Sequence, residues 1–212
     1  MAYSDFSLSS AKKTFQLTLI EKTDLFKESP ELKPSDSLQE SLKYNLPLAL
    51  ASNTEKSRSE MIITPILIDL RKHFSNQISI FSGINFTVDA TQGLNGNCDF
   101  LISHSEELLL VTAPIITLVE AKKEDLNAGL GQCIAEMVAA QLFNNKEDNQ
   151  INEIYGTVTS GTVWKFLKLT QNNVFIDLTE YYLGDLGKIL GILAAGINQI
   201  KSQLSEQSEN VL

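Results

Sequence analysis

Apolar residues recur at helical spacing in four parts of the chain. Leucines four residues apart predict a helix that begins at Ser35 or Asp36 and is interrupted near Pro47. A second helix is predicted to start after residues 52–54, and its isoleucines and leucines give it one buried face. The same spacing predicts helices at residues 125–146 and, interrupted by glycines, at residues 183–204.

The period changes to that of strands in the middle of the chain. An alternating run (residues 78–90), a short apolar run (98–103) and a β-branched run (113–123) predict three strands. Further strands are predicted at residues 15–19, 154–160, 163–169 and 172–178. The order of helices, strands, a strand that leads into a helix and a hairpin predicts a mixed α/β or α+β domain.

Composition indicates one globular domain. The 212 residues, with 43% hydrophobic and 20% charged positions, are expected to form a single unit over 1–212, with an extension at about 1–55 and a core at about 56–204. The longest apolar stretches fall short of the roughly 18 residues that cross a membrane, and the opening MAYSDFSLSS lacks the pattern of a signal peptide. A cytoplasmic protein is therefore expected. Cys98 and Cys133 are expected to be free thiols.

The candidate chemistry lies where the β-branched run ends, at Glu120-Ala121-Lys122. Side chains alternate along a strand, so Glu120 and Lys122 share a face and Ala121 points away. If the strand that starts at Asp99 pairs with this one, two carboxylates meet within metal-binding distance. Two oxygen ligands plus waters suit Mg²⁺. Such an ion polarises a phosphodiester and activates water, while a lysine stabilises negative charge. The pattern predicts phosphodiester hydrolysis.

These residues resemble the PD-(D/E)XK nuclease superfamily, whose restriction-endonuclease-like fold is a central mixed β-sheet flanked by helices. Asp99 and Glu120-Ala121-Lys122 match its acid and acid-x-lysine signature with twenty residues between the acids, and a helix follows. The resemblance spans roughly Glu60 to Leu169. It extends to uncharacterised bacterial or cyanobacterial members and to the nuclease domains of type I restriction subunits, which the hairpin at residues 155–169 resembles. Cys98 stands where the family name has a proline.

The resemblance implies Mg²⁺-dependent cleavage of DNA, less often of RNA, with Mn²⁺ as an alternative ion. It implies metal binding by Asp99, Glu120 and the carbonyl of Ala121, with Glu60 on a preceding helix as a further ligand. The superfamily also contains inactive members, so the alternative is an interaction or regulatory module.

Lys122 and Gln132 take supporting roles under the same resemblance. Lys122 would orient or activate the attacking water, and Gln132, in the following helix, would support Lys122 or a phosphate. The net charge of −9 argues against broad adhesion to nucleic acid or anionic membrane. Binding to DNA is therefore expected to need a local positive strip, which would comprise Lys122, Lys123, Lys165 and Lys168.

Each candidate residue also has a plain structural explanation. Glu120 and Lys122 could mark a strand that surfaces into a charged turn, and Asp99 could be a turn residue whose side chain bonds nearby backbone. Glu60 could be an acid favoured by a helix dipole, and Gln132 an exposed first-turn residue.

The C-terminal helix offers a possible homodimer surface. Its apolar residues repeat at helical spacing, although closing the domain core is the other use of such a face. The residues concerned are Leu183, Leu186, Leu190, Leu193 and Ile197.

Overall fold

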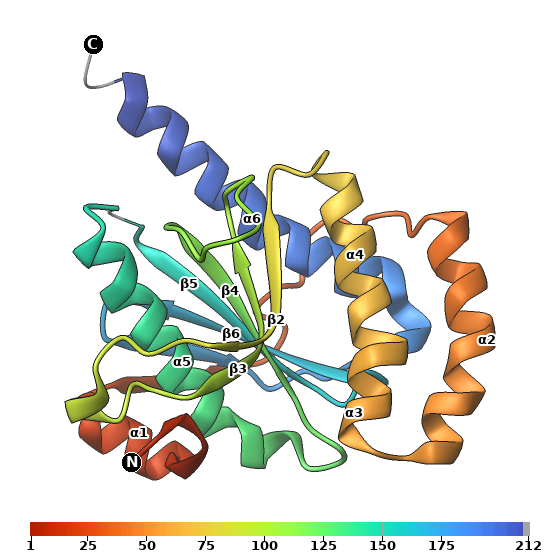
Figure 1. Cartoon of the computed structure of the whole chain (residues 1–212), viewed down its shortest axis with the longest axis horizontal. Coiled ribbons are helices and arrows are strands. Elements are labelled where there is room, and N and C mark those ends of the chain that lie inside the picture. Colours follow the sequence, from red (N-terminus) through yellow and green to blue (C-terminus); the bar gives the residue numbers. More distant parts are fainter. Residues whose placement is uncertain (150, 210–212) are drawn as a thin grey trace.

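A mixed β-sheet with helices on both faces forms the centre of the fold (Figure 1). The computed structural model describes residues 1–149 and 151–209, and within that range the side chains as far as Gln199. The described strands run in the order β1-β7-β6-β5-β4-β3-β2, with β8 paired to β6. Their bounds are β1 Thr18–Lys22, β2 Ser79–Asn85, β3 Asn97–Ser103, β4 Ile115–Ala121, β5 Glu153–Thr159, β6 Val163–Thr170, β7 Asn173–Asp177 and β8 Tyr181–Tyr182. The expected α/β class, a central mixed sheet flanked by helices, is confirmed.

The helices divide between the two faces of this sheet. Their bounds are α1 Leu8–Thr14, α2 Asp36–Ser52, α3 Glu55–Arg58, α4 Thr64–His73, α5 Leu126–Lys146 and α6 Leu186–Glu209. Two adjacent residues of β5 show the layering. A Cβ atom at Gly156 would meet Cys133 and Met137 of α5, whereas Tyr155, pointing the other way, packs against Gly196 of α6. Helix α1 lies against α5, and α2 lies outside α4 (Figure 1).

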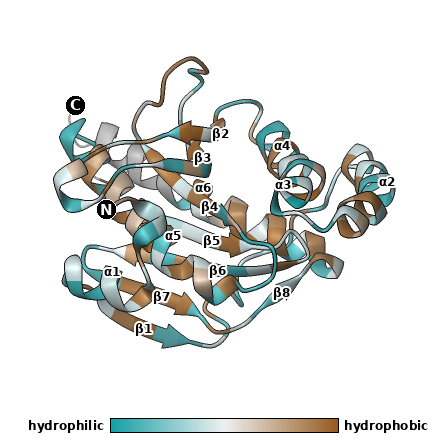
Figure 2. Cartoon of the chain, turned by 60° about the horizontal axis from the view of Figure 1, so that its bottom comes forward, coloured by the Kyte–Doolittle hydropathy of each residue, from teal (hydrophilic) through white to brown (hydrophobic). Residues whose placement is uncertain are grey.

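Strands β4 and β5 are parallel neighbours, with Glu120 opposite Val158. A parallel pair needs a long crossover, and α5 supplies it. Every residue of β4 is buried, because helices cover both faces, and this burial explains its continuous β-branched run. Hydrophobic residues, brown in Figure 2, recur along the middle strands. The crossover carries the chain from the end of β4 directly into the first turn of α5.

The N-terminal strand begins three residues later than expected. Residues 8–14 form α1 instead, which starts at a cap where the Ser7 side chain accepts from the Ser10 N–H. Phe15, expected in the strand, is the residue that ends this helix. The short alternation at 15–19 therefore belongs partly to the end of a helix, whose packing against α5 outweighs the local pattern.

Two other boundaries differ from the expectation. Helix α2 runs through Pro47 without interruption, because the burial of Leu38, Leu42 and Ala49 outweighs one missing main-chain hydrogen bond. Strand β2 ends at Asn85 rather than near residue 90, and the chain turns after Asp89, whose carboxylate accepts from the N–H groups of Thr91 and Gln92.

The second predicted helix begins at Glu55, after the cap Thr54, and reaches His73. It contains a π-helical segment, Ser59–Ile63, a feature that recurs near functional sites. Glu60 lies in that segment.

The apolar face of α6 closes the core. Leu190, Leu193 and Ile197 are buried, and Leu183 and Leu186 pack half-buried against the same core. This face is therefore used within the fold and does not support a homodimer, which stays a prediction. No helix within residues 1–149 and 151–209 has the length and apolar character needed to cross a membrane.

Candidate active site

The candidate site forms where β3 and β4 separate. Their last paired residues are Phe100 and Val119, so Asp99 and Glu120 come next on the two strands. Beyond this point β3 continues to pair with β2, while the Asp99 carboxylate accepts a hydrogen bond from the Ala121 N–H at 2.8 Å. The predicted pairing of these two strands is confirmed, and it brings the acid of one strand beside the motif of the other.

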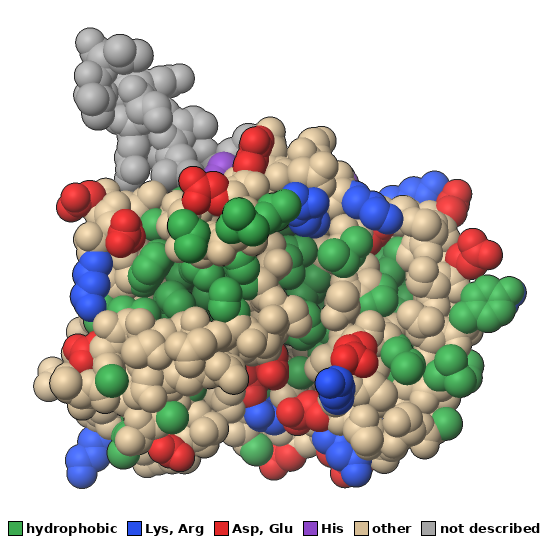
Figure 3. All heavy atoms as spheres, viewed as in Figure 1, with side chains coloured by type: hydrophobic (Ala, Val, Ile, Leu, Met, Phe, Trp, Pro, Cys, Tyr) green, Lys and Arg blue, Asp and Glu red, His purple; other side chains and the backbone are tan. Residues whose placement is uncertain are grey.

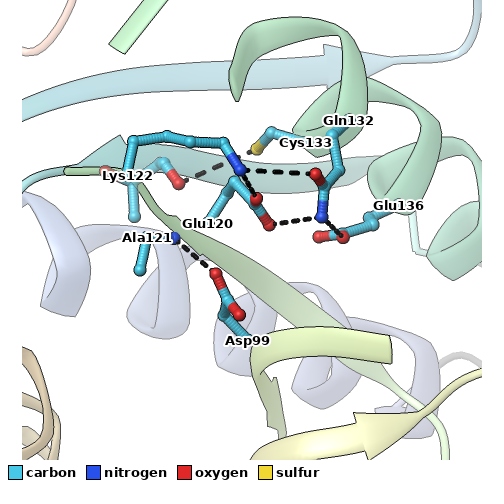
Figure 4. Close-up of polar contacts among 8 residues, drawn as sticks. Asp99, Glu120, Ala121, Lys122, Gln132, Cys133 and Glu136 are labelled. Carbon is cyan, nitrogen blue, oxygen red and sulfur yellow. Dashed lines mark hydrogen bonds and ion pairs between the residues drawn. The ribbon is translucent and has the colours of Figure 1, made fainter. Parts of the chain in front are cut away.

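Glu120, Lys122 and Gln132 form a hydrogen-bonded triangle (Figure 4). The Lys122 ammonium donates to Glu120 Oε1 in a short ion pair and lies 3.4 Å from Gln132 Oε1. The Gln132 amide donates from Nε2 to Glu120 Oε2 at 2.9 Å. Glu120 is 1% exposed and Lys122 23% exposed. The structure thus unites three of the predicted residues, and Gln132 is a part-buried bridge rather than an exposed first-turn residue.

Glu136 joins this triangle from the next turn of α5. Its Oε1 accepts a hydrogen bond from Gln132 Nε2 at 3.1 Å, and the residue is fully buried. Its other oxygen, Oε2, has no hydrogen-bond partner among the described residues. Glu136 is not among the site residues predicted from the sequence, although its position four residues after Gln132 places both on one side of a helix.

Burial dominates the electrostatics of the carboxylates. It raises the pKa of Glu120 to about 8, with a further rise from the charge of Asp99 and an opposing effect from Lys122. Burial also raises the pKa of Glu136 well above its ordinary value, with Glu120 adding to the rise. The pKa of Asp99 is raised by burial against the lowering effect of the Ala121 hydrogen bond. Burial alone would lower the pKa of Lys122, but the adjacent Glu120 charge raises it overall.

A cleft of about 340 Å³ opens beside Asp99. Glu60 reaches its wall but not the triangle, because its carboxylate is 61% exposed and lies 3.7 Å from the Lys56 ammonium. Glu55, in contrast to Glu60, interacts electrostatically with the triangle, because its charge raises the pKa of both Glu120 and Lys122. The cleft is lined by Glu55, Lys56, Ser59, Glu60, Ser82, Gly83, Asp99 and Phe100. Glu55 was missed because its place in a first helical turn, after the cap Thr54, is equally typical of a capping acid.

The donor atoms fit a hard divalent cation in type. Asp99 and Glu120 offer carboxylate oxygens, and the Ala121 carbonyl lies between the two motif side chains in sequence. Across the described residues, no three His, Cys, Asp or Glu side chains are grouped so as to hold a metal ion. Mg²⁺ is commonly held by one or two carboxylates with water and substrate phosphate completing its shell, so a pair of acids is compatible with it.

The positive strip expected from four lysines is not formed. Lys165 and Lys168 are three residues apart on β6 and therefore point to opposite faces of the sheet. Lys168 pairs with Glu153 at 2.9 Å, and Lys123 lies 3.7 Å from Glu124. On the face drawn in Figure 3, acidic and basic side chains are interspersed. Lys165 lies on the face of Glu120, because Glu120 is opposite Val158 and Val158 is opposite Lys165 across the sheet, so Lys168 is the member of the set that the geometry removes.

Both cysteines are buried free thiols, as expected. Burial raises the pKa of each thiol, Cys133 on α5 and Cys98 on β3. A buried thiol with a raised pKa is a poor nucleophile, so the chemistry of the site rests on its carboxylates and Lys122.

No protein-family model, curated protein or solved structure matches this chain. The resemblance to the PD-(D/E)XK superfamily therefore stays a prediction that depends on the motif residues.

Proposed function

We propose that this protein is a metal-dependent nuclease that hydrolyses phosphodiester bonds of DNA, with its restriction-endonuclease-like core in the cytoplasm. The observation that carries the proposal is the meeting of Asp99, Glu120 and Lys122 where β3 and β4 separate. Two acids and a lysine at diverging strand ends, with Asp99 lining a cleft, form a residue set suited to metal-assisted hydrolysis of a phosphodiester. The buried free thiols are compatible with a reducing compartment.

Asp99, Glu120 and the Ala121 carbonyl would hold Mg²⁺, with Mn²⁺ as a substitute. Held there, such an ion would supply electrophilic polarisation of the phosphodiester and acidification of water. Glu60 lines the same cleft as Asp99 and would be a further acid on the metal side of the site.

Lys122 is the cation of the site. Its ammonium stabilises negative charge that develops on the phosphate and orients the attacking water. Gln132 keeps it in place, because the amide oxygen accepts from Lys122 while the amide nitrogen donates to Glu120. The 23% exposure of Lys122 leaves part of its side chain accessible to substrate.

Cleavage assays on supercoiled, linear and branched DNA test this function. Wild-type protein with Mg²⁺ or Mn²⁺ is expected to cut, and chelation of the metal is expected to stop cleavage. Lys122→Met is expected to lower the rate at least about 100-fold, the scale on which loss of one charge-stabilising group acts. Lys168→Met, on the opposite face of the sheet, is the matched control and is expected to retain activity. Equal rates in the two variants would contradict the assignment.

A second candidate is a non-catalytic interaction or regulatory module that retains the fold. The observation in its favour is that Glu120 is 1% exposed and already paired with Lys122. Under this alternative the ion pair stabilises the end of β4, and wild-type protein neither binds Mg²⁺ nor cuts any DNA form.

A further inference from the structure

The Gln132 side chain is held by charged groups on both ends of its amide. Nε2 donates to Glu120 Oε2 at 2.9 Å and to Glu136 Oε1 at 3.1 Å, while Oε1 lies 3.4 Å from the Lys122 ammonium. Figure 4 shows the amide between the three side chains. An amide has two donor hydrogens on nitrogen and an acceptor oxygen, so all its bonding capacity toward these groups is used in one orientation.

The reversed orientation of that amide is unfavourable. A flip would turn the amide oxygen toward two carboxyl groups and the amide hydrogens toward the Lys122 ammonium. Glu120 accepts one of the two Nε2 hydrogens, and Glu136 accepts the other. Glu136 therefore adds to the preference for the orientation in which Lys122 finds an acceptor.

Core stability does not explain an acid at position 136. The residue is fully buried on α5, and its Oε2 is unpartnered among the described residues. A buried polar atom without a partner opposes folding, and an apolar side chain of similar size avoids that cost. The hydrogen bond that the carboxyl group accepts from Gln132 gives the acid a role at this position.

We infer that Glu136 is a positioning residue, which fixes the amide of Gln132 so that its oxygen faces Lys122 and its nitrogen faces Glu120. The catalytic meaning of this role rests on the proposed function, whereas the orientation of Gln132 can be measured without any activity. Glu136 acts through Gln132 and does not itself contact the cleft.

The protonated form of Glu136 retains the required acceptor. Burial raises the pKa of its carboxyl group, the charges of Glu120 and Asp99 add to the rise, and the Gln132 hydrogen bond and the charge of Lys122 oppose it. A neutral carboxylic acid still accepts through Oε1, as does the amide of a glutamine. The titratable groups that interact with Glu136 are Tyr3, Cys98, Asp99, Glu120, Lys122 and Cys133.

Two near-isosteric variants separate positioning from packing. Glu136→Gln keeps the acceptor, and Glu136→Met removes it while filling a similar volume. Asn144→Leu is the control, because Asn144 is also buried on α5 and bonds the main chain of Ile115, away from the triangle. Loss of stability alone would appear in Asn144→Leu as well.

The measurement is NMR of the ¹⁵N-labelled Gln132 side-chain amide. In wild type and Glu136→Gln, both Nε2 protons are expected to be protected from solvent exchange. In Glu136→Met, exchange of the amide is expected to rise about tenfold, which is the effect of losing one hydrogen bond, with a shift of one proton resonance. Unchanged Gln132 signals in Glu136→Met would overturn the inference. If that variant does not fold, Glu136→Asp, which withdraws the acceptor by one methylene, is expected to give the same shift.

Cleavage kinetics add a second readout. Glu136→Met is expected to lower kcat about tenfold with little change in KM, because Lys122 loses its fixed acceptor, and Glu136→Gln is expected to restore the rate. If wild-type protein cuts no DNA, the proposed function fails, and the amide signals still decide the role of Glu136.

Discussion

The Asp99 carboxylate accepts a hydrogen bond from the main-chain N–H of Ala121, the residue between Glu120 and Lys122. This bond stands where the ladder between β3 and β4 has ended, so Asp99 satisfies an N–H that the neighbouring strand no longer reaches. Asp99 consequently has a structural role in addition to the metal-binding role proposed for it.

Substitutions of Asp99 separate these two roles. Asp99→Asn retains an oxygen acceptor for the Ala121 N–H and is expected to leave the free energy of unfolding within about 1 kcal/mol of wild type. Asp99→Ala leaves that N–H unsatisfied and is expected to cost about 1–3 kcal/mol. Both variants are expected to lose Mg²⁺-dependent cleavage. Chemical denaturation measures the stabilities, and equal destabilisation by the two variants would contradict the structural role.

The pKa of Glu120 predicts how stability changes with pH. Folding raises this pKa from 4.5 to about 8, so between these values the folded protein keeps a proton that the unfolded chain has released. The stabilising contribution is complete below pH 4.5 and is lost as pH rises through 8. Glu136, whose pKa is also raised, acts in the same direction.

Glu120→Gln tests that dependence. Between pH 5 and 8 the free energy of unfolding of wild type is expected to fall with pH more steeply than that of the variant. The difference in slope is expected to reach about 1.4 kcal/mol per pH unit, the value for one proton. Urea unfolding at several pH values gives the slope. The same slope in wild type and in the variant would show that Glu120 does not titrate in this window.

The N-terminal segment packs closely on α5 at Gly131. A Cβ atom there would lie 2.3 Å from the Phe6 carbonyl oxygen and from a main-chain atom of Ser7. Gly131→Ala is therefore expected to destabilise the fold by about 1–3 kcal/mol, despite the better helix propensity of alanine. Gly184→Ala, where nothing lies within 4 Å, is the control and is expected to change little. Thermal unfolding compares the two, and a neutral Gly131→Ala would contradict the close packing.

Lys123 offers a test of DNA as the substrate. Its side chain is 51% exposed and follows Lys122 directly in the chain, whereas Lys168 is paired with Glu153 on the opposite face of the sheet. Lys123→Gln is expected to weaken DNA binding and to lower the slope of log affinity against log salt by about 1, the effect of one lost phosphate contact. Lys168→Gln is expected to leave both unchanged. Fluorescence anisotropy at several salt concentrations measures the slope, and identical behaviour of the variants would argue against contact at Lys123.

The sequence predicts much of the sheet and the central part of the site. The β-branched run, its charged end and the following amphipathic helix are strong local signals, and they place Glu120 on β4, Lys122 directly after that strand and Gln132 on α5. The pairing of Asp99 with this strand was a conditional prediction that the register confirms.

Tertiary packing accounts for what the sequence analysis missed. Helix α1 follows from contact with α5, which no local period reveals. Glu136 lies on a helix that is buried on most sides. A charged residue in a helical sequence is usually solvent-exposed, so the sequence alone does not indicate that this one is buried beside Gln132. The lysine strip was wrong because charges close in sequence on β6 alternate between faces, and pairing with Glu153 removes Lys168 from the set.

Calorimetric titration of Mg²⁺ into wild-type protein, Glu120→Gln and Glu124→Gln tests the central claim most directly. Glu124 is a matched control, since it is an acid four residues further along the chain with a 73% exposed side chain. Saturable binding is expected in wild type and in Glu124→Gln, and its loss is expected in Glu120→Gln. Binding that is the same in all three proteins, or no binding in wild type, would contradict a metal site centred on Glu120.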